Sequence, residues 1–229
     1  MPVETLVPES PIVDRPAPVR GTWRQYLAAV RVLVALTVLL GLLYPLAVTA
    51  IAQLPGLRDR ANGSLVQNGS GAAVGSRLLG QGFVDADGNP LRQWFQPRPS
   101  AAGKNGWDGT SSGASNLGPN NPDLIKVIEE RKTAIAAFDS VPGHTVTPAQ
   151  VPADAVTTSA SGLAPDISPA YARQQVYRVA AARRLDPVRV LAVVTDHVQG
   201  RTLGFLGEDR VNVLELNLAL DKLAGGAAS

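Results

Sequence analysis

The stretch VLVALTVLLGLLYPLAVTAIA, residues 32–52, is the feature around which this chain is organised. Between Arg31 and Arg58 there is no charged side chain. About twenty apolar residues that rise ~1.5 Å each match the ~30 Å hydrocarbon core of a bilayer. A soluble helix of that length shows a polar face, whereas every face of this one is apolar. The stretch therefore predicts one transmembrane helix, within residues 23–53.

A cleaved signal peptide is the alternative interpretation of the same stretch. Basic residues precede it, and Ala50-Ile51-Ala52 resembles a cleavage site. The apolar run is longer than the roughly 7–15 residues typical of a signal peptide, which favours a retained anchor. If cleavage occurred after Ala52, the product would be a secreted binding domain.

Flanking arginines predict the orientation of the helix. Four arginines precede the apolar stretch, whereas only Arg58 and Arg60 follow it closely. The basic excess on the first side places the N-terminus in the cytoplasm and the C-terminal part outside. We therefore expect a single-pass membrane protein with an extracytoplasmic domain.

Composition divides the chain into a tail, the membrane helix and one domain. Residues 1–22 contain five prolines and little apolar periodicity, which predicts a disordered cytoplasmic tail. Residues 58–224 are long enough to bury one core. The chain has no cysteine, which excludes disulfides, thiolate zinc sites and cysteine nucleophiles. The formal charge is +2, with the basic excess mostly near the N-terminus, so nucleic acid is not an expected partner.

Three helices are marked by a capping residue followed by proline at the first helical position. They begin at Asn121-Pro122, Ser168-Pro169 and Asp186-Pro187 and extend to about residues 138, 184 and 198. A fourth helix is predicted in VNVLELNLALDKLA, where Asn212 can serve as the cap, although the alternating leucines also fit a strand. We therefore expect an α+β domain with a small sheet and about four helices.

Short strands are expected in several runs. Residues 77–84 and 91–96 flank Asp-Ala-Asp-Gly-Asn-Pro, a turn sequence typical of a hairpin. Residues 155–158 and 201–206 are further candidates. The acidic turn is not an EF-hand loop, because Pro90 and Gln96 stand where that loop needs glycine and glutamate. No metal site is predicted.

The segment 97–121 is rich in Gly, Ser, Asn and Pro and is too long to be an ordinary connector. Trp107 and Leu117 would attach it to the domain. Arginine is common among interface anchors, and hydroxyl and amide groups can present polar atoms to another chain. The candidate contacts with a partner chain are Arg98, Ser100, Thr110, Ser112 and Asn116, together with Arg201.

An alternative function, that of a membrane-anchored cell-envelope hydrolase, depends on His197. It would act as general base, with a serine of the Gly/Ser loops as the nucleophile. The chain lacks the H-E-x-x-H pattern of zinc hydrolases. A histidine that forms a hydrogen bond near the end of a helix is the simpler interpretation. No catalytic residue is therefore predicted.

Beyond the apolar helix, three segments carry a family resemblance. The first contains RPSA at 98–101 and GTSSGASNLGPNNPDL at 109–124. The second, residues 154–180, contains TTSASGL, ISP and QVYRVA, and the third reads HVQGRTLGFLGEDRVNVLELNLAL at 197–220. They resemble the KdpC family, the C subunit of the bacterial high-affinity potassium-transporting P-type ATPase. Asp166 departs from the family, which often has histidine before Ile-Ser-Pro.

The resemblance implies a non-catalytic accessory subunit of a bacterial cell membrane. Its partners would be a potassium-channel-like subunit, an ATP-hydrolysing P-type subunit and a small one-helix subunit. The family is described as covering the potassium entrance on the outer face, and as a catalytic chaperone that raises the ATP affinity of the ATPase subunit. No cofactor is expected on this chain directly, because the complex handles ATP and potassium.

Two groups of residues are expected to matter if the resemblance holds. Ser159, Ser161 and Gly162 would make any direct contact with ATP. The small residues Ala35 and Gly41 are where we expect a neighbouring helix to approach. The predicted orientation places the folded domain across the membrane from cytosolic ATP, which favours the role at the outer face.

Overall fold

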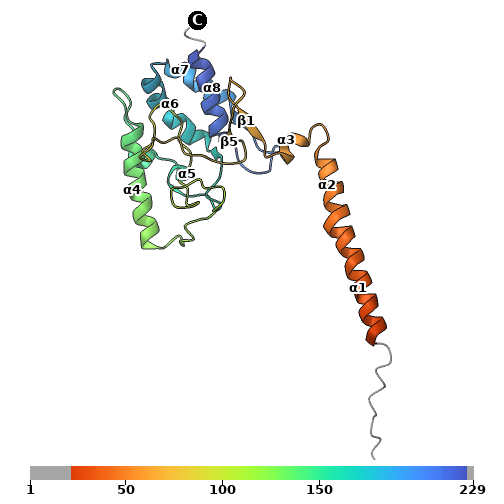
Figure 1. The fold of residues 1–229 in the computed structure, drawn as a ribbon. Helices are drawn as coiled ribbons and strands as arrows, with labels where there is room; N and C mark the ends of the chain where they lie inside the picture. The colour runs from red at the N-terminus through yellow and green to blue at the C-terminus, as the bar shows by residue number, and fades with distance from the viewer. Residues whose placement is uncertain (1–21, 226–229) are drawn as a thin grey trace, which may run out of the picture. The chain divides into compact units, whose positions relative to one another are not determined.

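The computed structural model describes residues 22–225, which divide into two compact units between Arg58 and Asp59 (Figure 1). The predicted tail, residues 1–22, lies outside the described residues except for Thr22. The first unit is one continuous helix: α1 (Thr22–Val38), a π-helical turn (Leu39–Leu43) and α2 (Tyr44–Ala52). Its 31 residues are, by length and composition, one candidate transmembrane helix. The predicted α+β architecture with an N-terminal apolar helix is confirmed.

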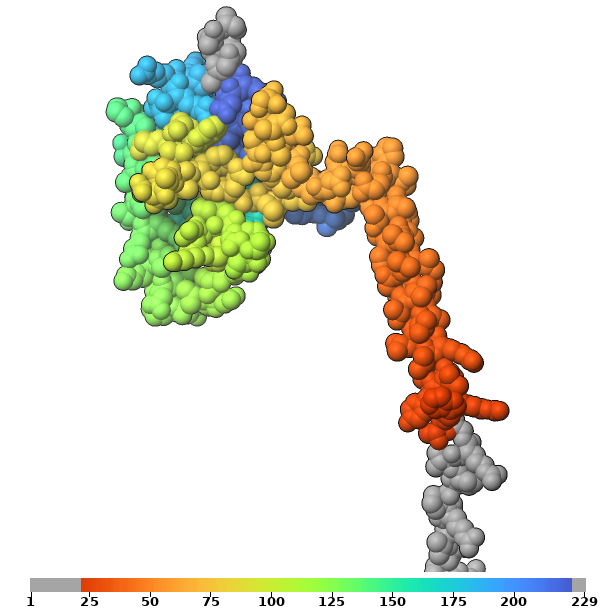
Figure 2. All heavy atoms as spheres, viewed as in Figure 1, coloured from red at the N-terminus to blue at the C-terminus, as the bar shows by residue number. Residues whose placement is uncertain are grey.

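Pro45 accounts for the π-helical turn. Proline has no backbone N–H, so the hydrogen-bond ladder of an α-helix cannot pass unbroken through its position. The helix widens just before it, and the N–H of Tyr44 donates to the carbonyl of Leu39, five residues back. Apolar side chains are exposed along the length of this helix, which Figure 2 shows from one side, as lipid or neighbouring helices require.

Four longer helices build the second unit: α4 (Pro122–Asp139), α6 (Pro169–Arg183), α7 (Pro187–Asp196) and α8 (Val213–Gly225). The first three begin at the predicted capping pairs. Each capping side chain accepts a hydrogen bond from a backbone N–H at 2.8–3.0 Å. Asn212 Oδ1 accepts from the N–H of Glu215 at 3.1 Å, which makes it the cap of α8. The C-terminal segment is therefore a helix and not a strand.

Two small antiparallel sheets accompany the helices. One pairs β1 (Leu65–Gln67) with β2 (Ala73–Ser76), and the other has the order β3 (Asp166–Ile167), β5 (Arg210–Asn212), β4 (Val198–Gln199). Three shorter helical turns complete the unit: α3 (Arg58–Ala61), a 3₁₀ turn at Pro148–Gln150 and α5 (Ala153–Val156). The β1–β2 ribbon was not predicted, because its flanks read as Asn-Gly-Ser turns.

The hydrophobic core gathers around α6. Its inward side chains are buried and share one cluster with side chains of α7, β5 and α8. The central members are Val176, Val179, Val190, Val194, Val211, Leu216 and Leu220. Leucine and valine at helical spacing therefore explain why these three helices pack together.

The predicted strands at 155–158 and 201–206 are wrong. α5 occupies the start of the first run, and the N–H of Thr157 closes it by donating to Ala153. In the second run, Leu203 and Gly204 have φ of 55° and 81°. This left-handed pair turns the chain back on itself, so only one isolated bridge forms there.

The acidic turn at 85–90 is present, but no regular strands flank it within the described residues. Asp85 Oδ1 accepts from the N–H groups of Asp87 and Asn89, and Val84 pairs with Pro90 in an isolated bridge. The hydrogen bonds from Asn89 lower the pKa of Asp85. The turn was therefore predicted correctly, whereas the predicted strands at 77–84 and 91–96 are wrong.

Candidate functional site

A buried ion pair lies inside the second unit, between α4 and α6. The side chains of Arg178 and Asp139 are exposed to only 0% and 1%, and Arg178 Nε lies 2.7 Å from Asp139 Oδ1. The same guanidinium donates to the carbonyl of Trp94 at 2.9 Å and to Gln175 Oε1 at 2.6 Å. Burial lowers the pKa of Arg178, and the Asp139 carboxylate opposes that shift. A buried charge with this many partners makes the surrounding elements rigid.

Two buried amide side chains take the place of a neighbouring strand. Gln175 Oε1 accepts from the N–H of Gln96 at 2.7 Å, and its Nε2 donates to the carbonyl of the same residue at 3.1 Å. Asn217 of α8 binds Phe95 in the same way, at 2.9 and 3.0 Å. The backbone N–H and carbonyl of Phe95 and of Gln96 are thus paired by side chains, without a partner strand. We call Gln175, Arg178 and Asn217 the polar clamp.

After the residues that the polar clamp binds, the loop 97–121 contacts the loop around residues 159–162. Ser100 Oγ donates to the carbonyl of Gly162 at 2.5 Å and accepts from the N–H of Trp107 at 2.7 Å. Ser112 Oγ donates to the carbonyl of Ser161 at 2.9 Å. We call these five residues the loop junction. It brings together four of the predicted site residues, from segments about 50–60 residues apart.

Glycine is required at position 162 of the loop junction. Its φ is +69°, and a Cβ there would lie 2.6 Å from the carbonyl oxygen of Gly113 and 2.7 Å from the nitrogen of Ala102. Both distances are far below ordinary contact. The close approach of the two loops therefore depends on the missing side chain.

The loop junction uses its polar atoms internally. Ser161 Oγ accepts from the N–H of Leu163 at 3.1 Å, and Ser159 Oγ accepts from Ala164 at 3.4 Å. These two bonds lie within one loop, whereas the bonds from Ser100 and Ser112 hold the two loops against each other. The geometry is that of a structural contact and gives no support to a phosphate-binding site.

The remaining interface candidates surround this contact or lie on another turn. Arg98 donates to the carbonyl of Thr157 at 3.3–3.4 Å. Thr110 Oγ1 donates to Asp108 Oδ1 at 2.7 Å, and this bond lowers the pKa of Asp108. Asn116 is exposed with a left-handed φ of 54°. Arg201 is exposed on the turn between β4 and β5.

An apolar cavity of about 380 Å³ opens beside the loop junction. It is lined by prolines and Trp107 from the loop, by side chains of α4 and by Tyr171 of α6; they include Pro97, Pro99, Ile135 and Phe138. Trp107 also covers Gly82, where a Cβ would lie 2.7 Å from the indole ring. The prediction that Trp107 attaches the loop to the domain is confirmed. Leu117, in contrast, is 38% exposed.

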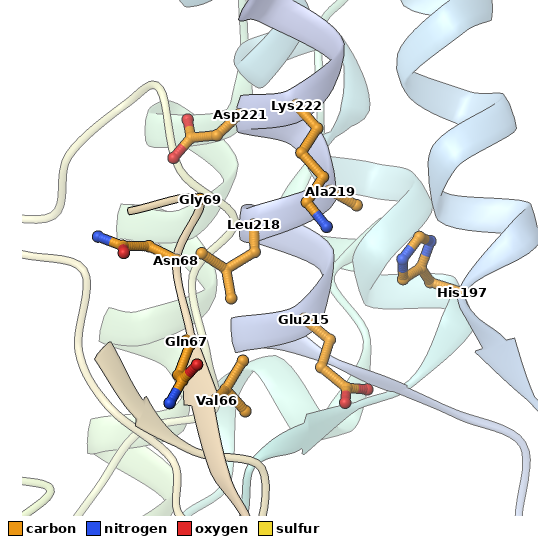
Figure 3. A pocket seen from close by; sticks show the side chains of 10 residues that line it. All are labelled: Val66, Gln67, Asn68, Gly69, His197, Glu215, Leu218, Ala219, Asp221 and Lys222. Carbon is orange, nitrogen blue, oxygen red and sulfur yellow. The ribbon is translucent and has the colours of Figure 1, made fainter. Parts of the chain in front are cut away.

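His197 lines a different cavity, of about 460 Å³, between α8 and the turn that follows β1 (Figure 3). Its Nδ1 lies 2.8 Å from the carbonyl of Val193, so this nitrogen carries the proton and donates. Glu215, Asp221 and Lys222 share the cavity, but no serine, threonine or cysteine is among the lining residues. The histidine therefore has no nucleophile to activate there.

One serine pattern of hydrolases does occur in the sequence. Gly109-Thr110-Ser111-Ser112-Gly113 matches G-x-S-x-G. In α/β-hydrolases that pattern sits on a sharp turn between a strand and a helix. Here it lies in the middle of an irregular loop, and α4 begins only at Pro122. The structure gives the hydrolase alternative no support.

Sequence reasoning missed the residues of the polar clamp. Gln175 and Arg178 occupy inward positions of α6, beside the buried apolar residues Ala172, Val176 and Val179. Polar side chains at inward positions of a helix were the available signal, because buried polar groups must find partners. The partners of the two amide side chains, Gln96 for Gln175 and Phe95 for Asn217, lie 79 and 122 residues away in the sequence, so no local pattern indicated them.

Comparison with known proteins identifies the family. A family model described as "K+-transporting ATPase, c chain" matches residues 26–222. This chain belongs to the KdpC family. The potassium-transporting ATPase KdpC subunit of Kineococcus radiotolerans is 53% identical over 201 residues, which cover 88% of this chain and 95% of that protein.

Other relatives of the KdpC family agree with this match. The KdpC subunit of Streptomyces coelicolor is 45% identical over 218 residues, 90% of this chain and 95% of the relative. The KdpC subunit of Myxococcus xanthus is 51% identical over 202 residues, 87% of this chain and 89% of the relative. The KdpC match runs through the candidate transmembrane helix, the polar clamp and the loop junction. The resemblance seen in the sequence is confirmed.

Proposed function

We propose that the chain is the accessory C subunit of an ATP-driven potassium uptake complex in a bacterial cell membrane. The observation that carries this proposal is the KdpC match over residues 26–222, which includes both the apolar helix and the folded unit. Relatives that are 45–53% identical over most of the chain are named potassium-transporting ATPase KdpC subunits. The subunit has no catalytic role of its own.

The apolar helix stays in the membrane as an anchor, with the N-terminus in the cytoplasm. The arginine bias across the helix supports this orientation. Because the chain has no cysteine, single-cysteine labelling tests it directly. A membrane-impermeant maleimide is expected to label Asn116→Cys in intact cells, and Ser10→Cys only after permeabilisation. Labelling of Ser10→Cys in intact cells overturns the orientation, and a mature chain that has lost residues 1–52 overturns the anchor.

The folded unit covers the potassium entrance on the outer face of a channel-like subunit. A surface that binds a partner with little reorganisation is favoured when its loops are held rigid beforehand. The polar clamp and the loop junction fix the loop 97–121 in this manner. The proposed contacts are Arg98, Ser100, Thr110, Ser112, Asn116 and Arg201, of which Thr110, Ser112, Asn116 and Arg201 are exposed.

An effect on the ATP affinity of the ATPase subunit would pass through partner contacts. In the proposed orientation the folded unit and cytosolic ATP lie on opposite sides of the membrane. The carbonyls of Ser161 and Gly162 accept from Ser112 and Ser100, and Ser161 Oγ accepts from the N–H of Leu163. We therefore expect no binding of ATP to the full chain in detergent at millimolar nucleotide. Saturable binding that is lost in Ser161→Ala would contradict this.

Co-purification tests the function as a whole. The tagged chain is co-expressed with a channel-like subunit, a P-type ATPase subunit and a small one-helix subunit, and is purified in mild detergent. We expect one complex that contains all four proteins and whose ATPase activity responds to potassium. A chain that purifies alone under these conditions overturns the proposal. Val188→Ala, at a 71% exposed position of α7, is the control for nonspecific loss of assembly.

A further inference from the structure

A backbone carbonyl beside Pro45 lacks the donors that a regular helix supplies. Pro45 has no N–H, so it cannot donate to Gly41, four residues back, or to Leu40, five residues back; for Gly41, the N–H of Leu46 stands at the five-residue spacing. Leu40 could accept from position 44 or 45. The N–H of Tyr44 donates to Leu39, and Pro45 has none. Within the described helix, the Leu40 carbonyl therefore has neither of its two possible donors.

The nearby hydroxyl of Thr49 does not fill this gap. Thr49 Oγ1 donates to the carbonyl of Pro45 at 2.8 Å. In hydrocarbon there is no water to pair a free carbonyl, and an unsatisfied backbone group there is costly. Helices interrupted by proline persist in membranes because neighbouring helices or their polar side chains satisfy the freed groups.

Gly41 makes the Leu40 carbonyl accessible to a neighbour. It has no side chain, and a Cβ built there would meet only the methyl group of Thr37, at 3.9 Å, within 4 Å. A second helix can therefore approach the backbone closely on this side. Thr37, Gly41 and Pro45 follow one another at spacings of four residues, which places them on one face of the helix.

We infer that a neighbouring membrane helix donates a hydrogen bond from a hydroxyl or amide side chain to the carbonyl of Leu40. The inference rests on the proposed function, which supplies the neighbour, a helix of the channel-like subunit. Ala35 is six residues from Gly41 and, at about 100° per residue, lies on another side of the helix. The donor helix therefore covers Gly41, and Ala35 faces something else.

The variant Pro45→Ala tests the acceptor. Alanine restores an N–H at position 45, so the helical ladder can close and the free carbonyl is lost. Hydrogen bonds between membrane helices are worth roughly a 3-fold to 18-fold change in association. We expect the variant to weaken association with the channel-like subunit by that factor, measured by dilution of the purified complex in detergent. The control Leu46→Ala removes more apolar surface but leaves the backbone unchanged, and it should stay within 2-fold of the parent.

Photo-crosslinking tests which face carries the contact. A photoreactive amino acid is placed at Thr37, on the face of Gly41, and in a second variant at Leu39, roughly half a turn away. We expect Thr37 to crosslink to the channel-like subunit and Leu39 to crosslink to lipid or another chain. A complex that assembles normally with Pro45→Ala, or one that crosslinks to the channel-like subunit only from Leu39, overturns the inference and leaves the proposed function intact. A crosslink from Thr37 to a second copy of this chain also overturns it, and failure of the parent chain to co-purify overturns the proposed function.

Discussion

Replacement of Arg178 by methionine tests the polar clamp most directly. The side chain is fully buried, and methionine keeps much of its length while removing the charge. The change leaves Asp139 as an unpaired buried carboxylate and removes the donors to Trp94 and Gln175. Removal of one partner of a buried ion pair costs about 3–5 kcal/mol. A single domain has roughly 5–15 kcal/mol in total, so we expect Arg178→Met to lose a large share of its stability.

The assay is a denaturant titration of the full chain in mild detergent, followed by tryptophan fluorescence. Trp94 suits this purpose because the guanidinium of Arg183 lies over its ring at 4.2 Å, next to the segment that the clamp holds. The double variant Arg178→Met/Asp139→Leu leaves no unpaired buried charge and is expected to recover part of the loss. If the single variant loses less than about 1 kcal/mol, or the double variant is less stable than the single one, the reasoning is refuted.

Further outcomes are expected at three other positions. Gly162→Ala should lower the free energy of unfolding by at least ~2 kcal/mol in the same titration, because its Cβ meets backbone atoms at 2.6–2.7 Å. The control Gly143→Ala, with φ +80° and no atom within 4 Å, should lower it by about 1 kcal/mol. Equal losses would contradict the role of Gly162 in the loop junction. Burial raises the pKa of Asp166 above 3.8, so the native state keeps the proton of this carboxyl to a higher pH than the unfolded state does. The protonated carboxyl therefore contributes stability that is present below pH 3.8 and is lost as the pH rises through the raised pKa. Asp166→Asn should flatten this fall in a pH series of unfolding titrations, and an unchanged slope would contradict it. His197→Ala should leave the potassium-stimulated ATPase rate of the complex within 2-fold of the parent, and a loss of more than about 10-fold would contradict the view that this histidine only forms a hydrogen bond at the end of α7.

Features fixed by neighbouring residues could be predicted from the sequence. The three Xaa-Pro caps and Asn212 act on N–H groups two or three residues away, so their sequence pattern contains nearly all of the physics. The apolar helix is decided by its own composition. The acidic turn at 85–90 closes through Asp85 and Asn89, four residues apart.

Features that are fixed by residues far apart in the sequence could not be predicted from it. Residues 91–96 have the alternation of a strand, yet the backbone groups of Phe95 and Gln96 pair with the side chains of Asn217 and Gln175. The turn at 201–206 is decided by the left-handed conformation of Leu203, a residue type that rarely adopts it. Four of the candidate site residues do meet in the loop junction, but the reason is contact between two loops, which no local pattern encodes.

The polar clamp also determines when the second unit can finish folding. Asn217 bonds to Phe95 across 122 residues, and Gln175 bonds to Gln96 across 79. In the proposed orientation the chain crosses the membrane with residue 59 ahead of α8. The segment 93–98 therefore emerges early, with only water to pair its amides, and waits for the rest of the chain. Contacts of such long range form slowly, because the intervening loop must close first. Arrival of the last helix on the outer side is thus the event that completes the unit, and a chain cut short before α8 would leave a segment near residue 95 open to periplasmic or surface proteases.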